Sequence, residues 1–218
     1  MTEFINTVDV IGDDEMCDRI IMRTVTEYKE NRIANVGTNA FFKCTELTTV
    51  DIPEVVTIYN SAFEQCSKLT SVNAPHASSI GQKAFQKCTA LERVCFPALI
   101  EISGFDRNYS LGSFSYNTTL EYVDLPVCTK IFGYSFNDST SLTTLILRND
   151  AQVCTLQNIN AFDATPISTG TGYIYVPRAL LEDYKVATNW STYANQFRAI
   201  EDYTVDGTVT GEFDESKL

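Results

Sequence analysis

The sequence contains little of what catalytic and metal-binding sites usually need. It has one histidine, His76, in 218 residues, and its seven cysteines include no C-x-x-C pair. His76 follows Pro75 with no serine or cysteine motif around it, so a nucleophilic triad is not indicated. The glycine-rich segment STGTGY lacks the Gly-Lys-Ser/Thr ending of a phosphate-binding loop. We therefore expect no enzymatic activity, no cofactor and no metal site.

Basic residues and long apolar runs are also scarce. Lysine and arginine number 16 against 28 acidic residues, which gives a net charge of -12. With no basic stripe, nucleic acid is not an expected partner. No apolar run approaches the ~20 residues of a transmembrane helix, so we expect no membrane span. The opening MTEFINTVDVIGDDEMCD has neither the basic start nor the apolar run of a secretory signal.

What the sequence does contain is a repeat, most often 22 residues long. Each copy has a phenylalanine after alanine or serine, a leucine six residues later and, in most copies, valine nine and proline twelve residues later. The phenylalanines are Phe41, Phe63, Phe85, Phe114, Phe136 and Phe162, and the leucines are Leu47, Leu69, Leu91, Leu120 and Leu142. A period of 20 to 29 residues with an L-x-x-L-x-L core is typical of leucine-rich solenoids.

The repeat predicts one strand per coil. In the segment from Leu47 to Ile52, Val50 and Ile52 face one side while Thr49 and Asp51 face the other. The proline that follows has no N–H for a parallel ladder, so the chain turns there. Since no coil can bury its apolar face alone, the coils must stack. We predict an α/β repeat fold, a right-handed leucine-rich-repeat solenoid with a parallel concave sheet and five to six coils over residues 32–177.

A small residue occupies one position of every copy. It is cysteine in the first three copies and another small polar residue later: Cys44, Cys66, Cys88, Asn117, Ser139 and Thr165. Such exchange predicts a reduced, buried side chain that bonds the backbone, rather than a disulfide or metal ligand. Cys95 lies on the outward side of its strand and is the best candidate for a reactive thiol, although chance placement explains it as well.

The two ends predict caps. Residues 1–31 carry eight acids and three bases, and residues 201–218 carry six acids and one base, so each end has a net charge of -5. We expect an N-terminal cap over 1–31, with a short helix in DDEMCDRIIMR and an opening strand in TVTEY. A C-terminal helical cap is expected over 178–200, where Trp190 seals the stack. Residues 201–218 form a hairpin at Asp206-Gly207 or an acidic tail.

The motif AFxxCxxLxxVxxPxxxxxI resembles the BspA-like leucine-rich repeats of bacteria and their phages, over residues 25 to 177. The segment from Ala161 to Gly211 resembles the closing segment of gut-bacterial and prophage-encoded members. This resemblance implies binding at an extracellular or virion surface rather than catalysis. Members usually carry an export signal or an anchor, and neither is visible in this chain.

Solenoids bind ligands on the concave sheet, and its later strands place tyrosines at outward positions. Tyrosine offers a large amphipathic contact and can stack on sugar rings. A seven-residue insertion before Phe114 adds neighbouring aromatic and basic residues. The predicted binding residues are Arg93, Tyr122, Asp124, Tyr173 and Tyr175, with Phe105, Arg107 and Tyr109 from the insertion. The alternative is that tyrosine occurs there because it suits strands.

Two functions therefore remain open. The first is a monomeric, non-enzymatic binding or adhesion module that recognises a protein or a glycan. The second is a phage or prophage virion component, such as a tail appendage.

Overall fold

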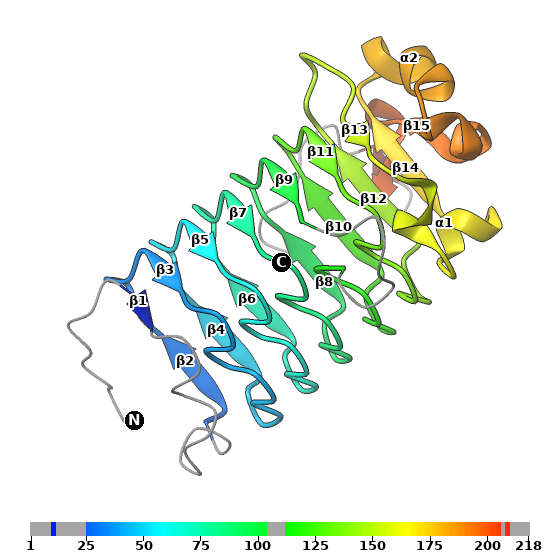
Figure 1. The fold of residues 1–218 in the computed structure, drawn as a ribbon. Helices are drawn as coiled ribbons and strands as arrows, with labels where there is room; N and C mark the ends of the chain where they lie inside the picture. The colour runs from blue at the N-terminus through cyan, green and yellow to red at the C-terminus, as the bar shows by residue number, and fades with distance from the viewer. Residues whose placement is uncertain (1–9, 12–24, 104–111, 206–207, 210–218) are drawn as a thin grey trace.

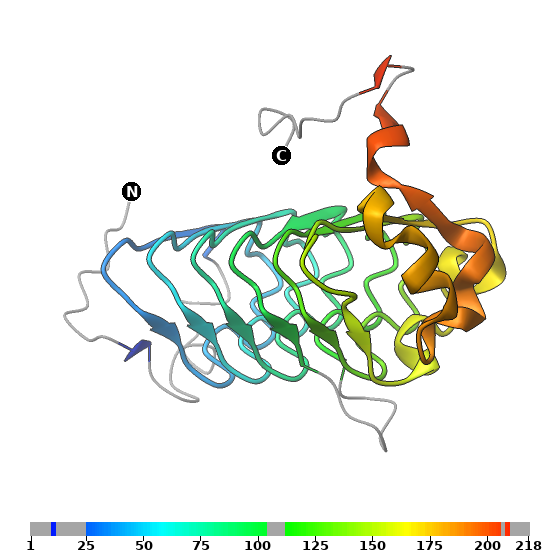
Figure 2. The same ribbon diagram turned by 90° about the horizontal axis from the view of Figure 1, so that it is seen from above.

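The chain winds into a solenoid of stacked coils (Figures 1 and 2). This computed structural model describes residues 10–11, 25–103, 112–205 and 208–209. Most coils contribute one strand of three or four residues and, after a bend, one strand of two residues. The strands of successive coils lie side by side, so two parallel sheets run along the stack. The predicted repeat solenoid is confirmed.

The longer strands form the surface called here the long-strand sheet. It has two sections, with strand orders β2-β4-β6 and β8-β10-β12-β14-β15, and β6 lies next to β8 (Figure 1). The strands are β2 (Glu27–Lys29), β4 (Thr49–Asp51), β6 (Ser71–Asn73), β8 (Arg93–Cys95), β10 (Tyr122–Leu125), β12 (Thr144–Leu147), β14 (Tyr173–Val176) and β15 (Phe197–Ala199). All pairs are parallel, as the repeat predicts.

The two-residue strands form a second parallel sheet on the other side of the bend. Its order is β1-β3-β5-β7-β9-β11-β13. The strands are β1 (Val10–Ile11), β3 (Asn35–Val36), β5 (Thr57–Ile58), β7 (Ser79–Ile80), β9 (Glu101–Ile102), β11 (Lys130–Ile131) and β13 (Thr155–Leu156). The proline after each of the first four repeat strands explains why the chain turns before it pairs again.

Helices occur, among the described residues, only near the C-terminal end. They are η2 (Ile159–Phe162), α1 (Pro166–Thr169), η3 (Arg178–Leu180), α2 (Leu181–Val186), η4 (Trp190–Gln196) and η5 (Ile200–Asp202). None of these described helices has the length and apolarity needed to cross a bilayer. Beyond them, β16 (Thr204–Val205) and β17 (Thr208–Val209) pair antiparallel, which is the hairpin outcome of the sequence analysis.

A column of stacked phenylalanine rings runs through the core. Consecutive rings from Phe41 to Phe162 have centroids 5.0, 5.2, 5.3, 5.6 and 5.6 Å apart, with interplanar angles of 14° or less. This spacing follows the distance between neighbouring strands of a sheet. The step from Phe85 to Phe114 is among them, so the insertion in this coil leaves the column intact.

The small residue after each phenylalanine ties neighbouring coils together. Cys66 Sγ donates to the carbonyl of Phe41 at 3.0 Å, and Cys88 Sγ repeats this contact with Phe63 at 3.2 Å. Ser139 Oγ makes the same bond two coils further on, to the carbonyl of Phe114 at 2.9 Å. This confirms the predicted buried side chain bonded to backbone. Cys44 is the exception, because it is disulfide-bonded, and the expectation of a reduced thiol is wrong there.

The C-terminal segment closes the end of the stack. Trp190 is fully buried, lies 5.9 Å from Phe162 between ring centroids, and donates from Nε1 to the carbonyl of Cys154 at 2.5 Å. The Tyr184 hydroxyl of α2 accepts from the amide of the same Cys154 at 2.8 Å. Asn189 precedes η4 without a side-chain cap hydrogen bond, and its Nδ2 donates to the carbonyls of Leu156 and Gln157. The closing segment also contains strand β15, where only helix was expected.

At the N-terminal end, β2 supplies the opening strand expected in TVTEY, and Tyr28 lies 4.8 Å from Phe41 between ring centroids. The helix expected in DDEMCDRIIMR lies outside the described residues.

Replacing Phe85 with alanine should cost about 3 to 5 kcal/mol of unfolding free energy, because a fully buried ring would leave a cavity inside a continuous column. Chemical unfolding followed by circular dichroism measures this difference. Val186→Ala, at a side chain 79% exposed, is the control and should change stability by less than about 0.5 kcal/mol. Equal stability of the two variants would contradict the phenylalanine column.

Candidate functional site

The outward side chains of the long-strand sheet form two columns, because the strands pair in register. Tyr122 pairs with Arg93 and Thr144, and Asp124 pairs with Cys95 and Ile146. The first column is Glu27, Thr49 and Ser71 in one section of the sheet and Arg93, Tyr122, Thr144 and Tyr173 in the other. The second is Lys29, Asp51 and Asn73 in one section and Cys95, Asp124, Ile146, Tyr175 and Arg198 in the other. Five predicted residues, Arg93, Tyr122, Asp124, Tyr173 and Tyr175, thus lie on one face.

The early half of this face is polar and internally bonded. Asp51 accepts from Lys29 Nζ at 2.6 Å and from Asn73 Nδ2 at 2.8 Å. The hydrogen bond from Lys29 lowers the pKa of Asp51 below its ordinary value. These side chains are small or already paired, so the early half offers a ligand little contact area.

Two of the predicted residues in the late half are covered. Tyr122 is 7% exposed and Asp124 is 1% exposed, so the expectation that both are open to a ligand is wrong. Arg93 lies over the Tyr122 ring, 5.3 Å from its centroid, and Arg148 lies against Asp124. Their burial gives these two residues a structural role in the face.

Arg148 and Asp124 form a two-pronged ion pair. Arg148 Nε donates to both carboxylate oxygens at 3.0 Å, and Nη2 donates to Oδ2 at 2.9 Å. Burial raises the pKa of Asp124 above the ordinary carboxyl value, and the hydrogen bonds from Arg148 oppose that rise. The pair therefore links β10 to the residue that follows β12 and holds this part of the face in place.

Exposed and half-buried aromatic and cationic side chains surround this pair. We define the tyrosine–arginine patch as Arg93, Tyr173, Tyr175, Arg198 and Tyr203. Arg198 lies over the Tyr173 ring at 4.4 Å from its centroid, and the Tyr175 and Tyr203 rings meet at 4.6 Å. Tyr173 is 38% exposed. Partial burial raises the pKa of both Tyr175 and Tyr203, so both carry their hydroxyl protons at neutral pH.

Three residues of this region were missed by the sequence analysis. Arg148 stands where earlier copies have proline, and this break in the repeat was the available signal. Arg198 and Tyr203 follow the last repeat, in a segment expected to form a cap or tail. No periodic signal marks them, because they reach the sheet through β15 and η5.

Other candidate residues contribute less to the site. Phe105, Arg107 and Tyr109 lie outside the described residues. Cys95 is a half-buried cysteine of β8, on the outer face of the sheet. His76 Nδ1 lies 2.8 Å from the carbonyl oxygen of Pro53. Since a carbonyl only accepts, Nδ1 is the donor in this contact. No cluster of three or more metal-ligating side chains occurs within residues 25–103 and 112–203.

A family model described as the BspA type leucine-rich repeat region matches residues 22–114 and 108–171 in six copies. The chain belongs to this family. No curated protein matches it.

Among solved structures, a leucine-rich cell surface protein from Faecalibacterium prausnitzii is 28% identical, with a TM-score of 0.64 over 81% of this chain and 45% of that one. A leucine-rich repeat protein from Bacteroides ovatus is 21% identical, with a TM-score of 0.56 over 71% of this chain and 40% of that one. The chain thus spans less than half the length of either protein. The second likeness concerns the fold alone.

Replacing Arg148 with leucine should destabilise the fold by about 3 kcal/mol at pH 7, because it leaves the Asp124 carboxylate buried without a counter-charge. In the variant, the pKa of Asp124 in the folded state would lie further above its value in the unfolded state, because the opposing hydrogen bonds from Arg148 are lost. A carboxyl group whose pKa is higher in the folded state than in the unfolded state stabilises the fold at pH values below its unfolded-state pKa. This stabilisation is lost as the pH rises through its folded-state pKa. The penalty should therefore be largest at pH 7 and shrink toward pH 4, as measured by urea unfolding.

The matched control is Arg178→Leu, since Arg178 pairs with Asp202 at the exposed surface. It should cost less than about 1 kcal/mol. An Arg148→Leu variant as stable as the control at pH 7 would show that the buried pair does not organise this face.

Proposed function

We propose that this chain is a non-enzymatic binding module that recognises a protein or a glycan through the outer face of the long-strand sheet. The observation that carries the proposal is the tyrosine–arginine patch on β8, β14 and β15 and the adjoining η5 segment. Tyrosine and arginine are the side chains that most often dominate binding energy at interfaces. They also suit sugars, because tyrosine rings stack on apolar sugar faces and guanidinium groups donate several hydrogen bonds.

The arrangement of the patch supports recognition better than catalysis. The carboxylate of Asp124, on the same face, is held by three hydrogen bonds from Arg148 and is buried. It is therefore poorly placed to accept a proton from a substrate. Phe105, Arg107 and Tyr109 remain part of the proposed surface as its neighbours along the chain.

We also propose that the module acts outside the cell, as a monomer. The Faecalibacterium prausnitzii relative is described as a cell surface protein. A patch of tyrosines and arginines at one end of a solenoid suits the binding of a protein or glycan that is carried on another cell.

Replacing Tyr173 or Arg198 with alanine should weaken binding to a ligand found on a glycan or host-protein array by about thirtyfold, the effect of losing one dominant contact. Titration by biolayer interferometry measures this change. The melting temperature should stay nearly constant, because both side chains lie at the surface.

The chain provides a matched control in Tyr59, an exposed tyrosine that follows β5 in the other sheet. Tyr59→Ala should leave binding unchanged. If Tyr173→Ala and Arg198→Ala bind like the wild type, the ligand does not use the tyrosine–arginine patch.

The second candidate function is a phage or prophage virion component. The closing segment from Ala161 to Gly211, which resembles those of prophage-encoded members, favours it. Mass spectrometry of purified particles from an induced lysogen should then find this chain in stoichiometric amount. Its absence from the particles, with the chain present in the culture, would contradict this assignment.

A further inference from the structure

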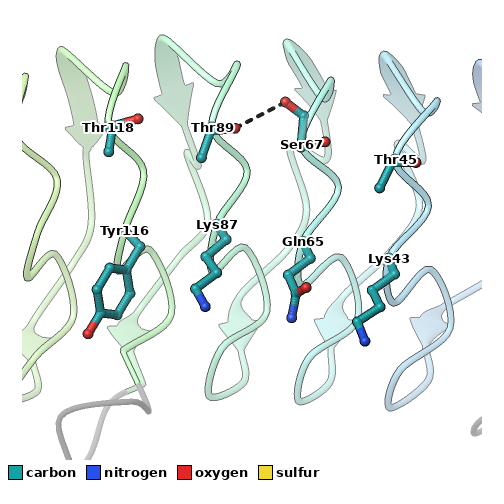
Figure 3. A pocket seen from close by; sticks show the side chains of 8 residues that line it. All are labelled: Lys43, Thr45, Gln65, Ser67, Lys87, Thr89, Tyr116 and Thr118. Atoms are coloured by element: carbon teal, nitrogen blue, oxygen red, sulfur yellow. Dashed lines mark hydrogen bonds between the residues drawn. The ribbon is translucent and has the colours of Figure 1, made fainter.

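A second surface of the solenoid lies along its bends, away from the tyrosine–arginine patch. Here a groove of about 720 Å³ crosses four successive coils. We define the bend groove by its lining residues, which are Lys43, Thr45, Gln65, Ser67, Lys87, Thr89, Tyr116 and Thr118. Figure 3 shows Lys43, Gln65, Lys87 and Tyr116 in one row and the four hydroxyl residues in a second, parallel row.

The rows are regular because the backbone at the bends forms its own ladder between coils. The amides of Lys43, Gln65, Lys87 and Tyr116 donate to carbonyls of the next coil at 2.8, 2.8, 3.0 and 2.9 Å. Every step therefore advances the row by one strand spacing, about 5 Å. The two lysines lie two steps apart, which places them about 10 Å from each other along the groove.

The residues of this row have a backbone conformation that long side chains rarely adopt. Lys43, Gln65, Lys87 and Tyr116 all have positive φ, between 60° and 65°. Glycine, asparagine or aspartate adopts this conformation at the least cost. Long basic and aromatic side chains at such positions therefore carry a backbone cost, which the fold also accepts outside the groove at Lys83 and Tyr134.

The charge of the groove is opposite to that of the chain. The net charge is -12, yet the lining contains two lysines and no carboxylate. Among the described residues, neither Lys43 nor Lys87 lies within salt-bridge distance of an acid, whereas Lys68 and Lys185 each pair with one at 2.7 Å. Lys87 Nζ instead lies 5.5 Å from the Tyr116 ring centroid.

The next coil ends the basic stretch. Asp138 occupies the position equivalent to Tyr116, and burial together with the Asp138 charge raises the pKa of Asp163 in the coil beyond. An anionic ligand is thus attracted over the four coils of the bend groove and repelled past Tyr116.

We infer that the bend groove binds an acidic polysaccharide that carries one carboxylate per disaccharide. A β-linked disaccharide is about as long as two coils, so alternate sugars would present their carboxylates to Lys43 and Lys87. The side chains of Thr45, Ser67, Thr89 and Thr118 offer hydroxyls that can exchange hydrogen bonds with those of the sugars, although Thr89 Oγ1 also donates to the carbonyl of Ser67 at 3.4 Å. Tyr116 provides a ring on which the last sugar stacks.

An acidic peptide fits the bend groove less well. The four amides of the lysine row are already bonded to the next coil, so no open strand edge is available to add a peptide strand. The lining also provides no apolar pocket for an anchoring side chain, since the Tyr116 ring is its one large apolar surface.

Hyaluronan oligosaccharides, in which carboxylates occur on alternate sugars, are the test probe, with dextran as the neutral comparison. Calorimetric titration should show hyaluronan binding that weakens between 50 and 300 mM salt, and dextran should not bind. Lys43→Glu/Lys87→Glu should bind about tenfold more weakly, and Lys43→Arg/Lys87→Arg should retain binding.

The control is Arg178→Glu/Lys185→Glu in the C-terminal cap, which changes the net charge equally and should bind like the wild type. Three results would overturn the inference: no hyaluronan binding at millimolar concentration, equal binding by the Lys43/Lys87 charge reversal, or equal binding of dextran. Loss of hyaluronan binding in Tyr173→Ala alone would move the ligand to the tyrosine–arginine patch. That outcome would support the proposed function while rejecting the groove.

Discussion

Stacking of the coils in register is the constraint on which the other features of this molecule depend. A single 22-residue coil has too little apolar surface to fold alone, and its phenylalanine and leucine become buried only between neighbouring coils. The column from Phe41 to Phe162 records this stacking directly, with five nearly parallel ring contacts. Because the column has ends, it needs Tyr28 at one end and Trp190 at the other.

The same register converts positions in the repeat into rows on the surface. Outward strand positions become the two columns of the long-strand sheet, and the residue two places after each phenylalanine becomes the row of the bend groove. The rows differ in chemistry because the positions are free to vary once the core residues are kept. One surface offers tyrosine and arginine on a rigid sheet, and the other offers lysines and hydroxyls at regular intervals.

Much of the fold could be predicted from the sequence, because the repeated residues are those that make the core. The period, the inward Val50 and the turn at Pro53 depend on local chemistry that one coil displays. The burial of Tyr122 and Asp124 could not be predicted in the same way. Asp124 is paired with Arg148 of the next coil, and Tyr203, beyond the last repeat, lies close enough to Tyr122 to affect its pKa; neither neighbour follows from the period.

The bend groove shows a similar limit. The positive φ of Lys43 and its equivalents arises from a ladder between coils, which becomes visible only when the coils are stacked. The small residue of the repeat was predicted to be a reduced, buried side chain because cysteine is replaced by other small polar residues in later copies. It holds for Cys66, Cys88 and Ser139 and fails for Cys44, whose disulfide is a property of one copy.

A crystal structure of the chain, at a resolution that orients aromatic rings, tests the in-register stack most directly. Stacking in register predicts one uninterrupted column from Phe41 to Phe162, with neighbouring rings nearly parallel and about one strand spacing apart, including across the insertion between Phe85 and Phe114. A column broken at that insertion, or rings that point out of the core in any coil, would contradict it.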